Sequence, residues 1–338
     1  MKMKKAGIIG GTGYTGGELA RILAVHPKID VTSMTSRQSA GKKVSDLHTY
    51  LKGYADLEFT EKLDTDVDIV FVATPHGVAM KELPALADAG IKVIDMSGDY
   101  RLHDPVQYQK WYGHEHTDVK HLDKAVYGLP ELFRSSLKNA DIIANPGCYA
   151  TSAILAMAPL FKANAVESDV IVDGKSGTSG AGMVPSARIH HPYCGESMIP
   201  YGTGTHRHTP EMEMALNMFS KKNANVLFSP HLLPIVRGII STCYLNLKKD
   251  LSEEDVQAIY QKQYGKEHFV HVVDEPSIRA VVASNHCQVG VKVFGRKVVA
   301  FSTLDNLVKG ASGQAVQCAN LMLGINEKTG LDVPGLGV

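Results

Sequence analysis

The residues KKAGIIGGTGYTGGEL at positions 4–19 decide the fold. An apolar run from Lys4 to Ile9 predicts a strand, and a helical pattern over Gly16–Val25 follows it after a glycine-rich turn. The turn fits both GxGxxG and GxxGxxG, spacings that let the backbone turn sharply and approach a pyrophosphate at a helix N-terminus. We therefore predict a dinucleotide-binding loop here. The alternative is a tight strand-to-helix turn that holds no ligand.

Strands and helices continue to alternate as far as Gly147. Further apolar strands are expected at Ile29–Met34, Asp68–Ala73, Lys92–Met96 and Asp141–Ala144. Continuous apolar strands between helices predict a parallel sheet that is covered on both faces. The expected fold class is therefore α/β, with a Rossmann dinucleotide-binding domain over residues 1–147.

The pattern changes after residue 147 to that of an α+β domain with a mixed sheet, over residues 148–307. A buried helix is expected at Tyr149–Phe161, and Gln288–Phe294 with Lys297–Thr303 predict a hairpin. A further helix is expected at Ala311–Leu323. It lies in a C-terminal segment, about 308–338, that we expect to pack back onto the first domain.

Composition excludes several classes of protein. The 338 residues are 44% hydrophobic and 21% charged, which is typical of a globular protein. Thirty-five basic residues balance 35 acidic ones, so no global field favours nucleic acid or an anionic membrane. The sequence shows neither a signal peptide nor an apolar run of the roughly 18 residues that span a bilayer. Five widely spaced cysteines without a CxxC pair predict no metal site and favour a reducing, cytoplasmic compartment.

The end of the second predicted strand indicates which dinucleotide binds. NAD-binding domains usually carry an acidic residue there, whereas this chain has Thr35-Ser36-Arg37. A carboxylate would repel a 2′-phosphate, but Arg37 can bind it with two hydrogen bonds and Ser36 can donate another. We predict NADP as the cofactor; the alternative is that Arg37 is an ordinary surface arginine.

Cys148 is the candidate nucleophile. In the run Asn145-Pro146-Gly147-Cys148, a strand ends, a turn follows, and the cysteine stands where a helix begins. A thiolate there is stabilised by the helix dipole, and the unpaired backbone N–H groups can bind an oxyanion. From its position alone, a small buried core cysteine is an equally good interpretation.

The run His206-Arg207-His208-Thr209-Pro210-Glu211 offers a partner for that thiol. Thr209 and Pro210 suggest a helix N-cap and first helical residue, which would place Glu211 where it can orient the His208 imidazole. We expect His208 to be the general acid and base, with His206 as the second candidate. The alternatives are a zinc site or a solvated histidine-rich loop.

A resemblance covers nearly the whole chain. The motifs that carry it, in order, are GGTGYTGGEL, TSRQSAGK, ATPHGVA, SGDYRL, YGLPEL, NPGCYAT, GKSGTSGAG, HRHTPE, PHLLPIVRGI and DNLVKGASGQAVQ. With these motifs the sequence resembles the N-acetyl-γ-glutamyl-phosphate reductases of arginine biosynthesis, whose broader relatives are the aspartate-semialdehyde dehydrogenases. One departure is that Arg188 is displaced from the position at which the family often has a basic residue.

The resemblance implies NADPH-dependent reduction of N-acetyl-L-glutamyl 5-phosphate to the 5-semialdehyde and phosphate, through a thioester on Cys148. It implies a homodimer or homotetramer. The implied cofactor contacts are Gly10, Thr12, Gly13, Tyr14, Thr15, Gly16, Ser36, Arg37, Ser176, Gly177 and Asn306. The candidates for holding the anionic acyl phosphate are Ser97, Arg101, Asn145, Lys175 and Arg237; structural ion pairing is the alternative for each.

Two other functions remain open from sequence. The same chemistry on a longer aminoadipyl phosphate, in lysine biosynthesis, would differ by one methylene, which is worth only about 1–3 kcal/mol in a pocket. A protein that binds NADP without catalysis would leave Cys148 inert to alkylation.

Overall fold

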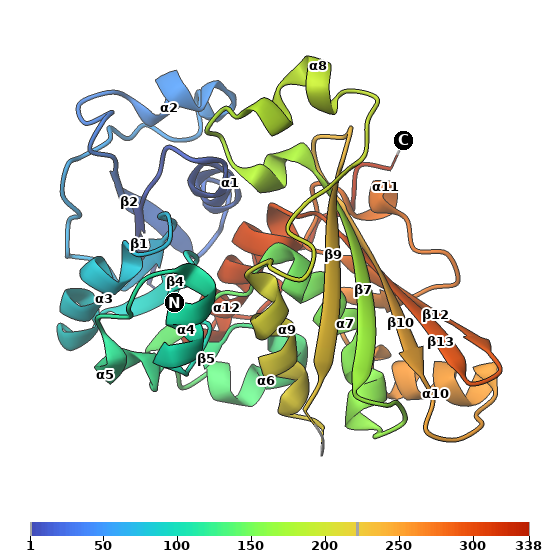
Figure 1. Cartoon of the computed structure of the whole chain (residues 1–338). Helices are drawn as coiled ribbons and strands as arrows, with labels where there is room; N and C mark the ends of the chain where they lie inside the picture. The colour runs from blue at the N-terminus through green and yellow to red at the C-terminus, as the bar shows by residue number, and fades with distance from the viewer. Residues whose placement is uncertain (1, 221–222, 338) are drawn as a thin grey trace. The chain divides into compact units, whose positions relative to one another are not determined.

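The glycine-rich turn follows β1 (Lys4–Ile9), an inner strand of a six-stranded parallel sheet (Figure 1). The computed structural model describes residues 2–220 and 223–337. In strand order β2-β1-β3-β4-β6-β5, every neighbouring pair is parallel. The other strands are β2 (Ile29–Thr35), β3 (Ile69–Val72), β4 (Lys92–Asp95), β5 (Val126–Tyr127) and β6 (Ile142–Ala144).

Helices bury this sheet. The β3 residues Ile69–Val72 are all buried, although alternate side chains of a strand point to opposite faces, so both faces are covered. Val70, Val72 and Ile142 pack with Leu83 and Tyr108 in one cluster. The helices of this unit are α1 (Tyr14–Leu23), α2 (Val44–Leu47), α3 (Ala79–Asp88), α4 (Pro105–Tyr112), α5 (Val119–Leu122), α6 (Pro130–Leu137) and α12 (Gly313–Met322), with a 3₁₀ turn at Thr49–Leu51.

The chain divides into two compact units. The first contains the residues up to Pro146 together with Ala311–Asp332; the second contains Gly147–Gly310 and the residues from Val333. Helix α12 contacts α1 and α6 within the first unit. It is shorter than the C-terminal segment expected from sequence, and Leu336 donates a backbone hydrogen bond to Val282 in the second unit.

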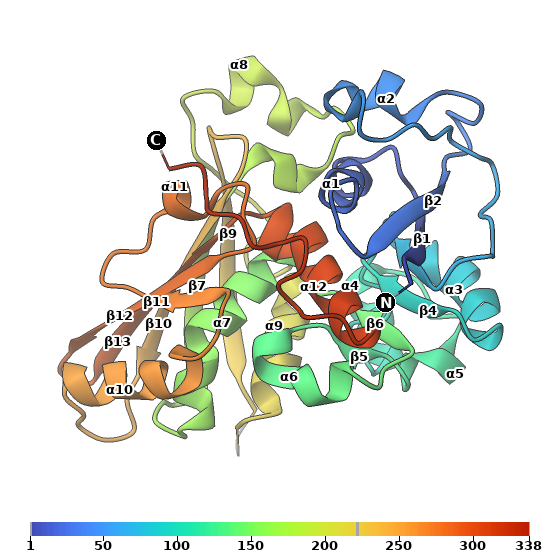
Figure 2. The ribbon, with the colours of Figure 1, turned by 180° about the vertical axis from the view of Figure 1, so that it is seen from behind.

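The second unit is built on a seven-stranded mixed sheet of order β11-β12-β13-β10-β7-β9-β8 (Figures 1 and 2). The pairs β7–β9 and β11–β12 are parallel and the others antiparallel. The strands are β7 (Asp169–Gly177), β8 (Ile199–Pro200), β9 (Asn225–Leu233), β10 (Ile239–Asn246), β11 (Val270–Val272), β12 (Cys287–Phe294) and β13 (Lys297–Leu304). The predicted α/β fold class and mixed second sheet are confirmed, as is the hairpin, which closes at the Phe294–Lys297 pair.

Helix α7 (Cys148–Lys162) forms the core of the second unit. Every residue from Tyr149 to Phe161 is buried, and the helix contacts β7, β10, β12 and β13. It therefore packs on one face of the sheet, across β7, β10, β13 and β12. The other helical segments are α8 (His191–Cys194), α9 (His208–Asn217), α10 (Glu253–Tyr264) and α11 (Ile278–Val281), 3₁₀ turns at Thr178–Ala181 and Ala187–Ile189, and a π-helical turn at Val308–Ser312. None of the helices in the described ranges has the length and apolar character that crossing a bilayer requires.

Candidate active site

The glycine loop has the shape that a pyrophosphate needs. Gly10 adopts a φ of +84°, and a β-carbon there would lie 2.5 Å from the Ala73 carbonyl oxygen. A β-carbon on Gly16 would lie 2.7 Å from the Gly10 oxygen, so this glycine allows strand and helix to pack closely. At Gly13, by contrast, a β-carbon would meet nothing within 4 Å. The loop is therefore tightly packed behind Gly10 and Gly16 and open at Gly13.

Helix α1 begins directly at this open position. Gly13 is its N-cap, and its first turn, which includes Tyr14 and Thr15, holds no acidic residue. The N-terminal N–H groups and the positive end of the helix dipole thus favour an anion. Ser312 supports the turn by donating a 3.0 Å hydrogen bond from Oγ to the Thr15 carbonyl oxygen. These residues fit the pyrophosphate of a dinucleotide.

Ser36 and Arg37 follow β2, as expected from sequence. The Arg37 side chain is 82% exposed and forms a 3.4 Å ion pair with Glu82. Ser36 Oγ accepts a hydrogen bond from the Ser39 N–H. An exposed ion pair of this kind contributes little stabilising free energy, so Arg37 can exchange it for a phosphate.

Cys148 is the first residue of α7, with Gly147 as the N-cap. It is partly exposed, whereas Cys194, Cys243, Cys287 and Cys318 are buried. Burial raises the pKa of the Cys243 thiol far above its usual range, which keeps that thiol protonated. The 15-residue helix begins without an acidic residue in its first turn, so its dipole favours a thiolate at Cys148.

Gly147 brings two residues of α9 to this helix end. A β-carbon on Gly147 would overlap Nε2 of His208, so the imidazole lies directly against the residue before Cys148. The Gly147 N–H donates a 2.7 Å hydrogen bond to Oε1 of Glu211, whose side chain is fully buried. Cys148, His208 and Glu211 are thus brought together by one turn.

One expectation about this segment was wrong. Helix α9 begins at His208 with Arg207 as N-cap, so Thr209 is not the cap and Pro210 is the third helical residue. Glu211 consequently reaches the Gly147 backbone, 64 positions away in sequence. Packing of α9 on α7 thus gives Glu211 a long-range partner that spacing along the chain did not suggest.

His206 lies among aromatic rings. The ring centroids of Tyr149, Tyr201 and Phe228 are 5.8, 5.6 and 5.2 Å from that of His206. Its Nδ1 accepts a 3.1 Å hydrogen bond from the His208 backbone N–H. Burial, with a smaller repulsion from Arg207, lowers the pKa of His206 to about 4. His206 is therefore neutral near pH 7 and suited to holding the backbone of His208.

The C-terminal end of β7 carries three of the predicted site residues. Lys175 forms a 2.5 Å ion pair with Asp173, and both side chains are partly exposed. Ser176 is buried, and its hydroxyl donates to the Gly177 carbonyl oxygen. A β-carbon on Gly177 would lie 2.6 Å from the Val236 oxygen, so a glycine is needed for the end of β7 to pack against the loop before β10.

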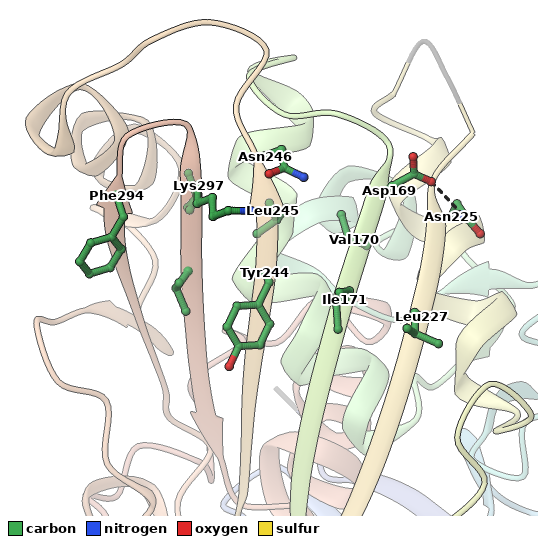
Figure 3. Close-up of a pocket in the computed structure, with 12 residues that line it drawn as sticks. Asp169, Val170, Ile171, Asn225, Leu227, Tyr244, Leu245, Asn246, Phe294 and Lys297 are labelled. Atoms are coloured by element: carbon green, nitrogen blue, oxygen red, sulfur yellow. Dashed lines mark hydrogen bonds between the residues drawn. The ribbon is translucent and has the colours of Figure 1, made fainter.

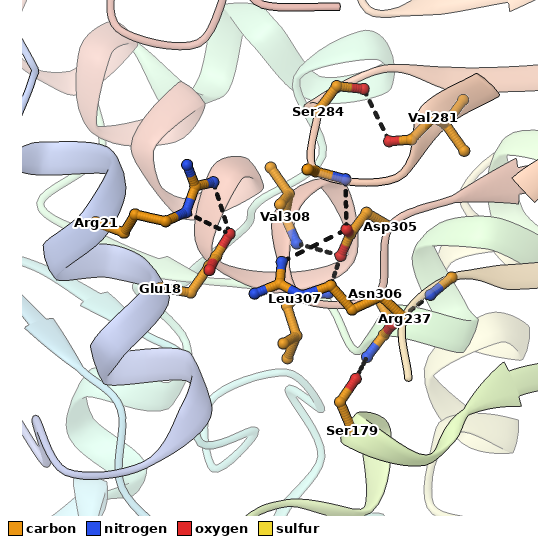
Figure 4. Close-up of polar contacts among 12 residues, drawn as sticks. Glu18, Arg21, Ser179, Arg237, Val281, Ser284, Asp305, Asn306, Leu307 and Val308 are labelled. Atoms are coloured by element: carbon orange, nitrogen blue, oxygen red, sulfur yellow. Dashed lines mark hydrogen bonds and ion pairs between the residues drawn. The ribbon is translucent and has the colours of Figure 1, made fainter. Parts of the chain in front are cut away.

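Arg237 and Asn306 meet beside Asp305 (Figure 4). Asp305 is fully buried; it accepts hydrogen bonds from three backbone N–H groups and lies 3.5 Å from the Arg237 guanidinium. Asn306 accepts a 2.8 Å bond from the Gly238 N–H and donates a 2.9 Å bond to Ser179 Oγ. The Asn306 amide thus joins the loops after β7 and before β10, while Arg237, 28% exposed, retains an accessible side chain.

Ser97, Arg101 and Asn145 lie in the first unit. The Ser97 hydroxyl donates a 2.6 Å bond to Asp95, whose pKa is raised by burial and by repulsion from Asp99. Arg101 is buried, and its Nε donates a 2.8 Å bond to the Asn145 carbonyl oxygen. Asn145 Nδ2 in turn donates to the Ala311 carbonyl oxygen. Arg101 and Asn145 thus hold the chain that leads to Pro146-Gly147-Cys148, whereas Ser97 holds the Asp95 side chain at the end of β4.

Sequence reasoning missed several residues of the site. A β-carbon on Gly310 would lie 2.8 Å from Cys148 Cβ, so this glycine makes room for the nucleophile. Asp305 positions Arg237, and the Tyr149 ring packs against both His206 and His208. The small residues in the run Lys309-Gly310-Ala311-Ser312 could have indicated that another segment packs closely here, but not that this segment carries Cys148. Arg188, displaced in the sequence, stacks 5.2 Å from the Tyr201 ring centroid.

The outer face of the second sheet, opposite α7, is apolar and exposed. Ile171, Leu227, Tyr244 and Phe294 are 48%, 51%, 45% and 68% exposed. Figure 3 shows that their side chains project from β7, β9, β10 and β12, and they line a shallow cavity of about 670 Å³. A contiguous apolar patch of this kind marks an interaction surface.

Comparison with known proteins agrees with this architecture. Residues 5–140 match the family described as semialdehyde dehydrogenase, NAD binding domain, and residues 148–306 match semialdehyde dehydrogenase, dimerisation domain. Aspartate semialdehyde dehydrogenase II from Vibrio cholerae shares the fold with a TM-score of 0.71 at 18% identity, over 96% of this chain and 99% of that one. The Candida albicans enzyme, solved with NADP, has a TM-score of 0.72 at 17% identity, over 95% and 99%.

Relatives by sequence are more specific. The N-acetyl-gamma-glutamyl-phosphate reductases of Methanococcus maripaludis and Methanocaldococcus jannaschii are each 48% identical over 99% of both chains, and that of Clostridium novyi is 45% identical over the same share. The NAD-binding domain makes the cofactor a nicotinamide dinucleotide. The chain belongs to the N-acetyl-gamma-glutamyl-phosphate reductase family of the semialdehyde dehydrogenases.

Proposed function

We propose that the chain reduces N-acetyl-L-glutamyl 5-phosphate to the 5-semialdehyde with NADPH, through a thioester on Cys148, as a step of arginine biosynthesis. The observation that carries the proposal is the site around Gly147, where the nucleophile begins α7 and the His208 imidazole packs against the preceding residue. Relatives that match the full length are named for this reaction.

The chain's own residues carry the proton and the acyl group. His208 accepts the thiol proton while the Cys148 sulfur attacks the acyl carbon, and the bond from that carbon to the phosphate oxygen breaks. Phosphate leaves with the electron pair, so a thioester remains on Cys148. When bound, reduced nicotinamide supplies a hydride. The tetrahedral oxyanion then re-forms the carbonyl, the carbon–sulfur bond breaks, and His208 returns its proton to the departing sulfur.

The remaining residues support binding. Gly10, Thr12, Gly13, Tyr14, Thr15 and Gly16 form the pyrophosphate loop, and the absence of an acidic residue at Thr35-Ser36-Arg37 favours NADP over NAD. Lys175 and Arg237 are partly exposed cations suited to an anionic substrate. We assign Arg101 and Asn145 to the support of the loop that leads to Cys148, Ser97 to holding the Asp95 side chain, and Ser176, Gly177 and Asn306 to the shape of the loops next to Arg237.

We also infer a homo-oligomer that pairs through the outer sheet face, because four exposed apolar side chains there belong to the part of the chain matched by the dimerisation domain. Neutral composition and thiol cysteines suit a cytoplasmic enzyme that acts on a small molecule, without nucleic acid or membrane.

A direct test follows NADP reduction by N-acetylglutamate semialdehyde in the presence and absence of phosphate. Activity should depend on phosphate, and Cys148→Ser should lower kcat by on the order of 10³-fold or more. NADP affinity should change less than about twofold, because the sulfur does not contribute to dinucleotide binding. Cys194→Ser, the same substitution at a buried cysteine on α8, is the matched control and should retain activity. An active Cys148→Ser enzyme would exclude the thioester.

A further inference from the structure

Three histidines gather at the edge of the second sheet, among residues that the proposed reaction does not use. His268 lies just before β11, His271 lies on it, and His286 directly precedes β12. Strands β11 and β12 are parallel neighbours, paired at Val270–Cys287, and β11 is the edge strand (Figure 2). Strand pairing therefore brings together side chains from two separate segments of the chain.

The rings lie at defined positions. Nε2 of His271 is 2.9 Å from Nδ1 of His286. The centroids of the His268 and His286 rings are 5.7 Å apart, and these two residues can present ligand nitrogens within 4.8 Å of each other. Both rings also pack on Phe269, at centroid distances of 4.8 and 5.4 Å, and Phe269 is only 1% exposed. A buried aromatic ring thus limits how the two imidazoles can turn.

The hydrogen bond to His271 has a consequence for His286. When His286 donates from Nδ1 to Nε2 of His271, its own Nε2 carries a lone pair. A metal-bound histidine almost always has this arrangement, with the second ring nitrogen donating to a fixed acceptor.

We propose that His268 and His286 bind one divalent transition-metal ion of the zinc class, with His271 orienting His286 through the 2.9 Å hydrogen bond. Imidazole is a preferred ligand of such ions, at about 2.0–2.1 Å. Water can complete the coordination because both side chains are partly exposed. The ion would pin β11, a strand of three residues, to the start of β12.

The site is tested with the untagged full-length protein in a Cys148→Ser background, so that the reactive thiol cannot bind the metal. Calorimetry with Zn²⁺, and visible absorption with Co²⁺, should show one equivalent bound. His268→Asn and His286→Asn should each weaken binding at least about tenfold, and His271→Asn should weaken it about 10- to 100-fold, the range of second ligand-shell losses. His191→Asn, at an exposed histidine on α8, should leave the affinity unchanged.

A second measurement does not depend on calorimetric heat. Bound Zn²⁺ should raise the melting temperature of the parent protein and of His191→Asn, but not that of His286→Asn, because a ligand stabilises only the state that binds it. Unchanged affinity in both His268→Asn and His286→Asn, or no binding by the parent protein, would overturn the proposal. Either result leaves the reductase proposal untouched, since none of the three histidines takes part in that reaction.

Discussion

Glu211 accepts a 2.7 Å hydrogen bond from the backbone N–H of Gly147, the residue directly before Cys148. The first N–H groups of a helix have no partner within the helix, so this contact caps α7 from a neighbouring helix. Glu211 is fully buried, so water has no access to this hydrogen bond in the folded protein. The contact thus fixes the turn from which the sulfur projects and links the nucleophile to α9, the helix that begins with His208.

Two substitutions of Glu211 distinguish the effect of losing the hydrogen bond from the effect of losing side-chain volume. Glu211→Ala leaves the Gly147 N–H without this acceptor and should lower the free energy of unfolding by about 1–3 kcal/mol, with a fall in kcat. Glu211→Gln keeps an oxygen that can accept and should lose less than about 1 kcal/mol. Urea unfolding and steady-state kinetics measure both. Equal destabilisation by the two variants would show that the hydrogen bond is not the important feature.

Gly147→Ala tests the contact between His208 and the nucleophile's turn. The φ of −72° at Gly147 suits alanine, but the added methyl group would overlap His208 Nε2 and displace the imidazole. We expect kcat to fall on the order of 10²-fold with little loss of NADP affinity.

A double mutant gives the control for this prediction. In a His208→Ala background the methyl group meets no imidazole, so adding Gly147→Ala should lower kcat almost no further. Additive losses in the double mutant would mean that the methyl group acts elsewhere than on His208.

Local sequence patterns predicted much of the fold. The glycine turn after β1, the continuous apolar β3 and the β12–β13 hairpin each depend on neighbours within a few residues, and these features are present in the structure. The predicted start of α9 was two residues too late, because Thr209 and Pro210 are typical of a helix N-terminus, whereas His208 already adopts the helical conformation.

The parts of the site that depend on long-range contacts could not be predicted from the sequence. Cys148 and His208 could be singled out from their motifs, whereas the contact of Glu211 with Gly147 and the approach of Gly310 to Cys148 depend on packing between distant segments. Asn306 shows the same difficulty. Its motif suggests a cofactor contact, and in the structure its amide oxygen and its amide nitrogen each have a hydrogen-bond partner in an adjacent loop. Spacing along a chain cannot predict such partners.

His206 should influence stability as a function of pH without being the catalytic base. Its pKa of about 4 in the folded protein lies below the unfolded value of 6.5, so the folded state holds fewer protons between these limits. The stability that results is fully present above pH 6.5 and is lost as the pH falls toward 4, by about 3 kcal/mol in all. Urea unfolding at several pH values should show this loss in the wild type and a smaller one in His206→Phe.

Kinetics of the same variant separate the two histidines. His206→Phe should keep kcat within about tenfold of wild type and retain the acid limb of the pH profile, whereas His208→Asn should lose about 10²–10⁴-fold. His191→Asn, at an exposed histidine, should change neither stability nor rate. Loss of the acid limb in His206→Phe would transfer the acid–base role to His206.

Arg37 should discriminate NADPH from NADH. Arg37→Ala removes hydrogen bonds to a charged 2′-phosphate, each worth about 1.5–3 kcal/mol, so the KM for NADPH should rise at least about tenfold while that for NADH stays constant. Lys42→Ala, at another exposed cation of the same segment, is the matched control and should have a small effect on both. A parallel rise for NADPH and NADH would mean that Arg37 does not read the 2′-phosphate.

The outer sheet face should control assembly. Leu227 is 51% exposed on β9 and is paired with Ile171 on the neighbouring β7, so a charge there would have to be buried in any interface formed by this face. Leu227→Glu should therefore shift the protein toward the monomer, as measured by sedimentation or by size exclusion with light scattering, because an unpaired buried charge costs several kcal/mol. Leu47→Glu introduces the same charge at a leucine of the first unit that is 44% exposed, and should leave the assembly unchanged. An oligomer that survives Leu227→Glu but dissociates on Leu47→Glu would place the interface on the dinucleotide-binding unit instead.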